Sequence, residues 1–133
     1  MDLSLRYIKM CEKAKQLQKE WKPKIGDFYN CEGEIFLNGF EKEKDFENFL
    51  RKTEKCFCVF KQDQLQEILN LKVIKYGLLN EIGNILYRAY KDRYVSGFAF
   101  DSFEQLWLAF VMYKKYGKIW DNKKEEWIKE EER

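Results

Sequence analysis

The sequence contains no histidine, a single proline and only seven glycines among its 133 residues. Without histidine it cannot carry a Ser-His-Asp triad, a Cys-His dyad, a His-bearing zinc site or a histidine pH switch. The scarcity of proline and glycine argues against a disordered chain. Long apolar runs are also missing, and none approaches the roughly 20 residues of a membrane span. Charged residues interrupt the N-terminal segment, so no signal peptide is expected.

Aromatic and charged residues, in contrast, are plentiful. Aromatic side chains make up 17% of the residues and charged side chains 36%, with a formal net charge of +2. A chain of this length can bury roughly two-thirds of its unfolded surface, so one domain over residues 1–133 with a proper core is expected. Positive and negative segments alternate along the chain, which fits a surface of mixed sign better than a nucleic-acid track. Residues 129–133 are expected to form a frayed charged tail.

Four cysteines stand at positions 11, 31, 56 and 58. Since no signal peptide is expected, the compartment is predicted to be reducing, with the cysteines as free thiols. Cys56 and Cys58 are two residues apart on a predicted strand, so their side chains point to the same face and could together chelate a metal ion. A four-cysteine zinc site, however, usually has two close pairs. Ordinary buried cysteines are the favoured interpretation, so neither a metal nor another cofactor is expected.

Apolar residues at spacings of three and four predict four main helices. They cover residues 3–20, 63–71, 78–91 and 102–116. Pro23 excludes any continuation of the first helix, and Gln62–Asp63 is expected to cap the second. The last helix is the most strongly indicated, since Asp101 and Glu104 form a capping-box pattern and Gly117 provides a C-terminal stop. Its apolar residues surround it on almost every side, so we expect it either to be buried all round or to cover two partners.

Short apolar segments between these helices predict a small antiparallel sheet. A hairpin is expected near residues 25–37, with its turn at Gly33, and the apolar run 56–60 adds a third strand. A second hairpin is predicted over residues 118–128, around Asp121–Asn122. Helices and strands in this order give an α+β fold, in which the sheet packs with the four helices.

No catalytic grouping of residues is recognisable, so the sequence predicts a binding protein and not an enzyme. Aromatic and basic residues interleave in one segment, where aromatic faces could stack on bases while cations contact phosphates. The candidate binding residues there are Tyr87, Arg88, Lys91, Arg93, Tyr94 and Phe98. The alternative interpretation is that they are ordinary solvated and core positions.

Trp120 and Trp127 form a second candidate site, as aromatic anchors for a protein partner, because tryptophan is enriched at interface hot spots. The alternative here is a hydrophobic minicore that holds the terminal hairpin. A protein partner is therefore expected, with a nucleotide or nucleic acid as the alternative and no membrane association. The sequence leaves homo-oligomerisation open.

Three blocks of sequence stand out, namely WKPKIGDF at 21–28, FKQDQLQEI at 60–68, and EQLWLAFVM at 104–112 continued by YGKIWD at 116–121. Together they resemble a group of small uncharacterised proteins encoded by bacteriophages and prophages of low-GC Gram-positive bacteria. The resemblance implies a phage or prophage origin and intracellular action, in the cytoplasm of a host bacterial cell, and it carries over no catalytic or binding residues. The leading hypothesis is an accessory protein that binds a host or phage macromolecule. The alternative is nucleotide or nucleic-acid binding that could sequester a nucleotide signal of host defence.

Overall fold

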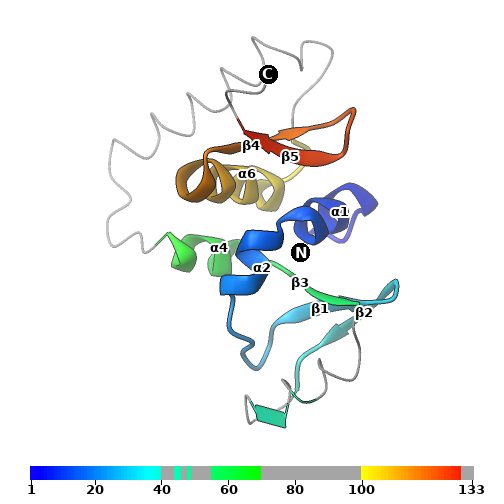
Figure 1. Ribbon diagram of the computed structural model, residues 1–133. Helices are drawn as coiled ribbons and strands as arrows, with labels where there is room; N and C mark the ends of the chain where they lie inside the picture. The colour runs from blue at the N-terminus through cyan, green and yellow to red at the C-terminus, as the bar shows by residue number, and fades with distance from the viewer. Residues whose placement is uncertain (40–43, 46–47, 49–54, 70–99, 130–133) are drawn as a thin grey trace.

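The computed structural model describes residues 1–39, 44–45, 48, 55–69 and 100–129, which adopt an α+β fold, as predicted (Figure 1). The helices described in these ranges are α1 (Leu5–Lys13), α2 (Lys15–Glu20), α4 (Gln62–Ile68) and α6 (Phe103–Tyr116). The strands are β1 (Phe28–Cys31), β2 (Glu34–Leu37), β3 (Cys56–Val59), β4 (Lys118–Asp121) and β5 (Glu126–Lys129). The predicted helix 78–91 lies outside the described residues.

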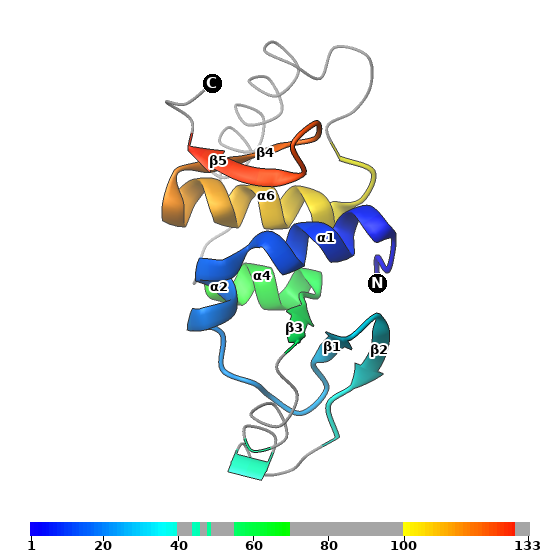
Figure 2. The same ribbon diagram turned by 45° about the vertical axis from the view of Figure 1, so that its right-hand side comes forward.

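Helix α6 lies between two antiparallel units. Figure 2 shows the β4–β5 hairpin on one side of α6 and α1 on the other, with the sheet of order β2-β1-β3 beyond α1. The contacts agree with this order, because α6 contacts β4, α1 and α4, and α1 contacts β3 and β5. Helix α1 therefore joins the two units. Within the described ranges, no helix is both long and apolar enough to cross a membrane.

The side chains from Trp107 to Met112 are buried without interruption, so the middle of α6 is covered on all sides, which is one of the two arrangements that its sequence predicts. Gln105, two residues before Trp107, is also fully buried. Solvent reaches α6 only toward its ends, where Phe103, Lys114 and Lys115 are exposed. The position of α6 at the centre of the described structure follows from its apolar composition.

Both ends of α6 are capped, but the predicted N-terminal cap is wrong by one residue. Ser102 is the N-cap residue, and its hydroxyl accepts a hydrogen bond from the backbone N–H of Gln105 at 3.2 Å. Asp101 instead pairs with Arg6, with 3.1 Å between Oδ2 and Nη1. Gly117 ends the helix with a left-handed φ of 65°, as predicted.

The helix predicted over 3–20 is interrupted at Ala14. The ψ of 59° at Ala14 lies outside the helical region, so α1 and α2 are separate helices. Gln18 supports the break, because its amide nitrogen donates to the carbonyls of Cys11 at 3.0 Å and Cys58 at 2.8 Å, and its oxygen accepts from the Cys58 backbone N–H at 2.8 Å. These bonds tie the break to β3. The predicted apolar stripe is still buried at Tyr7, Met10, Cys11, Ala14 and Leu17.

The first hairpin starts later than predicted. Its first strand begins at Phe28 and not near Ile25, because Gly26 has a φ of 90°, which interrupts an extended strand. The turn at Gly33 is confirmed, with a φ of 92° there. Strand β3 pairs antiparallel with the other edge of β1 and is the predicted third strand.

The boundaries of the remaining helices and strands differ slightly from the predicted ones. The C-terminal hairpin is confirmed as β4 and β5. Lys61, and not Gln62–Asp63, is the N-cap of α4, and its backbone N–H donates to Gln64 Oε1 at 2.7 Å. Lys129 is the last residue of β5 and so does not belong to a frayed tail, whereas residues 130–133 lie outside the described part of the chain.

Asp27 is a carboxylate that is only 3% exposed, and it accepts three hydrogen bonds. Its Oδ2 accepts from Trp21 Nε1 at 2.9 Å and from the backbone N–H of Lys24 at 2.7 Å, and its Oδ1 accepts from Gln64 Nε2 at 2.5 Å. Burying a charge is costly unless hydrogen bonds compensate for the lost water. Because Trp21 follows α2 and Gln64 belongs to α4, Asp27 joins the segment before β1 to two helices.

Cys31 and Cys56 form a disulfide, so the prediction of free thiols is wrong for this pair. The two residues face each other in the register of β1 and β3, with their Cα atoms 4.2 Å apart. Cys11 and Cys58 are free and buried, as predicted. Burial raises the pKa of the Cys11 thiol to about 12, and it also raises the pKa of Cys58 well above the ordinary value. Both are therefore held as unreactive thiols.

We expect reduction of the Cys31–Cys56 disulfide to lower the free energy of unfolding by about 3–4 kcal/mol, because the bond closes a loop between residues 25 positions apart. Urea denaturation with and without a reductant measures the change. The double variant Cys31→Ser/Cys56→Ser should match the reduced protein and be indifferent to the reductant. Alkylation of all four cysteines after unfolding without a reductant would show that the bond is absent.

Asp27→Ala should lower the free energy of unfolding by about 2–3 kcal/mol, because the buried amide of Gln64 and two partly buried donors, from Trp21 and Lys24, lose their acceptor. Chemical denaturation of the variant and the parent protein measures this difference. Glu34→Ala is the control, since Glu34 is exposed on β2 and should change stability by less than about 0.5 kcal/mol. Equal effects of the two substitutions would show that the Asp27 hydrogen bonds do not stabilise the fold.

Candidate functional site

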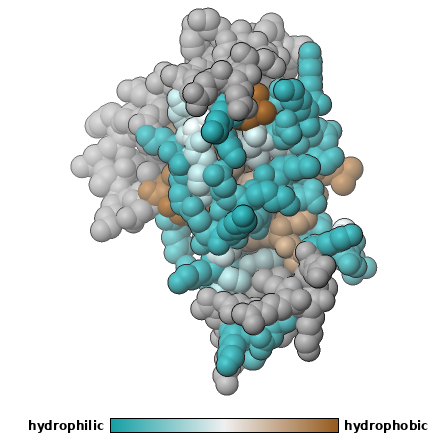
Figure 3. Space-filling view, in the orientation of Figure 1, coloured by the Kyte–Doolittle hydropathy of each residue, from teal (hydrophilic) through white to brown (hydrophobic). Residues whose placement is uncertain are grey.

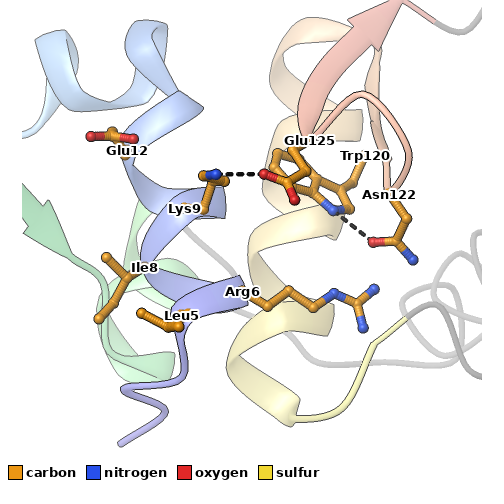
Figure 4. Close-up of a pocket in the computed structure, with 8 residues that line it drawn as sticks. All are labelled: Leu5, Arg6, Ile8, Lys9, Glu12, Trp120, Asn122 and Glu125. Carbon is orange, nitrogen blue, oxygen red and sulfur yellow. Dashed lines mark hydrogen bonds and ion pairs between the residues drawn. The ribbon is translucent and has the colours of Figure 1, made fainter.

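A groove of about 650 Å³ lies between α1 and the β4–β5 hairpin (Figure 4). The buried stripe of α1 faces the core, so a neighbouring part of the helix surface forms one wall of the groove. The turn between β4 and β5 and the nearby Trp120 form the other wall. The lining residues are Leu5, Arg6, Ile8, Lys9, Glu12, Trp120, Asn122 and Glu125.

The apolar part of the groove combines Leu5, Ile8 and Trp120. Leu5 is 88% exposed, although it belongs to a helix with a well-buried apolar stripe. Figure 3 shows a described surface that is largely hydrophilic in this view, with apolar side chains in separate patches. Trp120 is almost fully buried, and its Nε1–H donates to Asn122 Oδ1 at 2.9 Å. This bond fixes the amide of Asn122, so its NH₂ group is the part that can donate.

The charged residues of the groove carry both signs. Lys9 Nζ lies 2.5 Å from Glu125 Oε2, and the two side chains are about half exposed. The hydrogen bond from this ammonium to Glu125, together with the charge of that carboxylate, raises the pKa of Lys9. Arg6 and Lys9 stand against Glu12 and Glu125, so the lining is electrically balanced.

Arg6 has an incomplete set of hydrogen bonds. Its Nη1 pairs with Asp101, and its guanidinium carbon lies 6.0 Å from the centre of the Phe100 ring. Its Nε and Nη2 atoms are buried and have no hydrogen-bond partner among the described residues. A buried donor without an acceptor costs about 1–3 kcal/mol. Unpaired buried donors in a native fold therefore require an explanation, and one explanation is a ligand that binds to them.

Asp2 holds the segment just before α1 against the start of α6. Its Oδ2 accepts from the Ser102 hydroxyl at 2.5 Å and from Gln105 Nε2 at 2.9 Å, and its Oδ1 accepts from the Ser4 backbone N–H at 2.9 Å. Partial burial by itself raises the pKa of Asp2, but these hydrogen bonds outweigh it, and the net effect is a lowered pKa. The network fixes the end of the groove where Arg6 lies.

The predicted anchor residues Trp120 and Trp127 are brought together but not exposed. Their ring centres are 5.1 Å apart in an edge-to-face arrangement, and the two residues are 3% and 8% exposed. Trp127 Nε1 donates to the Met10 carbonyl at 3.0 Å, which ties the hairpin to α1. This placement matches the alternative of a minicore that holds the hairpin. A role as partner anchors stays a prediction that would require the rings to become accessible.

The other candidate binding residues lie outside the described part of the chain. They are Tyr87, Arg88, Lys91, Arg93, Tyr94 and Phe98.

Sequence reasoning missed the groove. Arg6, Lys9 and Glu12 are ordinary polar positions of an amphipathic helix, and Asn122 and Glu125 are ordinary turn residues. Nothing in their local pattern shows that the two segments meet.

Comparisons with protein-family models, with curated proteins and with solved structures find no significant match for this chain.

Because the pKa of Asp2 in the folded protein lies below its ordinary value of 3.8, the carboxylate contributes stability that is present above that value and is lost as the pH falls through the lowered pKa. We expect Asp2→Asn to lower the thermal midpoint at neutral pH, and the difference from the parent protein to shrink below about pH 4. Circular dichroism melts across this pH range measure the difference. A difference that stays constant with pH would contradict the role of the Asp2 charge.

Proposed function

We propose that this chain is a non-enzymatic binding protein of a phage or prophage, and that it takes a polypeptide segment of a host or phage protein into the groove between α1 and the β4–β5 hairpin. The observation that carries the proposal is the exposed Leu5 beside a groove with an apolar floor at Trp120 and polar groups at its rim. Concave sites of this composition suit ligands with both apolar and polar parts. A polypeptide has both.

The charge of the groove favours a polypeptide over a nucleic acid. Glu12 and Glu125 line the groove, and Lys9 is already paired with Glu125. A nucleic-acid backbone would place repeated negative charges beside these carboxylates, which lowers affinity. A polypeptide can instead pair its own side chains with charges of either sign.

The proposed origin and compartment rest on the sequence. The three blocks at 21–28, 60–68 and 104–121 support a phage or prophage origin and action in the cytoplasm of the host bacterium. The lack of histidine supports a binding role, because it removes the commonest general acid–base group. In that compartment the Cys31–Cys56 disulfide would face a pool of reducing thiols.

A photo-crosslinking side chain at position 5 tests the proposed groove, because Leu5 is highly exposed and lines it. We expect irradiation in a nuclease-treated bacterial lysate to attach one recurrent protein. The matched control carries the same side chain at Ile25, which is 63% exposed and does not line the groove. Mass spectrometry identifies the attached proteins, and purified partner then gives a dissociation constant with Leu5→Asp as the disrupting variant.

Each outcome of this experiment bears on the proposal. Attachment of the same set of proteins from both positions, or of none, would refute the groove as a binding site. A partner that is lost after nuclease treatment would favour nucleic-acid binding instead. Affinity that falls at least tenfold in Leu5→Asp, with an unchanged thermal midpoint, would support the proposal.

A further inference from the structure

We infer that Arg6 recognises a carboxylate, and that the ligand of the groove is a peptide segment that presents one there. The inference rests on the proposed function, because it names the chemical group that the groove would select. It starts from Nε and Nη2 of Arg6, two nitrogen atoms that have no hydrogen-bond partner in the part of the chain that the structure describes. The described contacts otherwise account for this side chain.

The two atoms form one edge of the guanidinium. Nε–H and one N–H of Nη2 point in parallel, and their spacing matches the two oxygens of a carboxylate, so both bonds can form at once. Asp101 uses Nη1 and leaves this edge untouched. An arginine whose second fork is buried and unpaired is prepared for an anion that arrives with a binding partner.

Asn122 supplies a further donor beside this edge. Its oxygen is occupied by Trp120 Nε1, so its NH₂ group is the end that can bind an acceptor. Figure 4 shows the Asn122 amide and the guanidinium of Arg6 turned toward the same space, one from the hairpin turn and one from α1. Donors from two elements therefore converge on one position.

The surrounding charges favour a single negative charge on the ligand. Arg6 and Lys9 lie near three carboxylates, those of Asp101, Glu125 and Glu12. These carboxylates repel each added negative charge, so a phosphate dianion is disfavoured relative to a carboxylate. Leu5 and Ile8 offer apolar contacts to the residue that carries or precedes the carboxylate.

The Lys9–Glu125 ion pair joins the two walls of the groove, and its side chains are 45% and 53% exposed. An ion pair this exposed contributes little to stability, so a ligand can displace it. Neither Asn122 nor Glu125 is buried, so the turn side chains have room to move.

The carboxylate can come from the C-terminus of a polypeptide or from an Asp or Glu side chain, and small probes distinguish them. We would titrate the intact protein with N-acetylleucine, N-acetylleucinamide, N-acetylglutamic acid α-amide and inorganic phosphate. The signal is the Nε–H resonance of Arg6 in a ¹H–¹⁵N spectrum, identified by its loss in Arg6→Lys. N-acetylleucine should shift this resonance if a C-terminus is the source, and the glutamate amide should do so if a side chain is the source.

N-acetylleucinamide and phosphate are expected to leave the resonance in place at the same concentrations. No shift with either carboxylate, or equal shifts with acid and amide, would overturn the inference. So would a shift produced only by phosphate. Asn122→Asp provides a second variant on an exposed turn, and it should weaken the carboxylate shift because it places a negative charge beside the ligand.

With the polypeptide identified by crosslinking, Arg6→Lys should weaken binding at least tenfold, because lysine keeps the charge but lacks the fork. A thermal midpoint equal to that of the parent protein serves as the control for folding. Unchanged polypeptide affinity in Arg6→Lys would overturn carboxylate recognition and leave the groove as the binding site. Shifts with carboxylates but no captured polypeptide would refute the proposed function and retain the Arg6 site.

Discussion

A helix that is apolar on nearly every side has to be covered on every side, and this requirement organises the described structure. The uninterrupted burial from Trp107 to Met112 leaves the middle of α6 no solvent face, and α1, α4 and the β4–β5 hairpin all pack around the helix. The hairpin is held in turn by Trp127, whose indole donates to the Met10 carbonyl of α1. Helix α1 thus contacts both the three-stranded sheet and the β4–β5 hairpin, and its buried apolar stripe packs in the core.

The groove follows from this arrangement. Helix α1 and the hairpin both rest on α6 and diverge above it, so their polar side chains face each other across a gap that packing does not fill (Figure 4). The Lys9–Glu125 pair bridges the gap, while Arg6 reaches into it with the three N–H groups of its Nε and Nη2 atoms unpaired among the described residues. A fold selected only for stability gains nothing from those unpaired donors. Their persistence is the physical reason to look for a ligand there.

Local patterns in the sequence are sufficient to predict those features of the fold that depend on neighbouring residues alone. Gly117 ends α6, Gly33 turns the first hairpin, and the apolar stripe of α1 is buried, because each depends on residues close along the sequence. The break at Ala14 could not be predicted, since its hydrogen bonds come from Gln18 to a strand some 40 positions away. The Cys31–Cys56 bond and the Arg6–Asp101 pair, 95 positions apart, likewise depend on the assembled fold. The candidate site was missed for this reason.

The Cys31–Cys56 disulfide also turns residues 31–56 into a covalent ring. A protease that cuts once anywhere between positions 32 and 55 opens the ring without releasing a fragment. The piece with α1 stays attached through sulfur to the piece with α6, and the nicked protein migrates as one band on a non-reducing gel. Only a reductant separates the two halves. Cleavage and dissociation are therefore separate events in this protein, and a thiol controls the second.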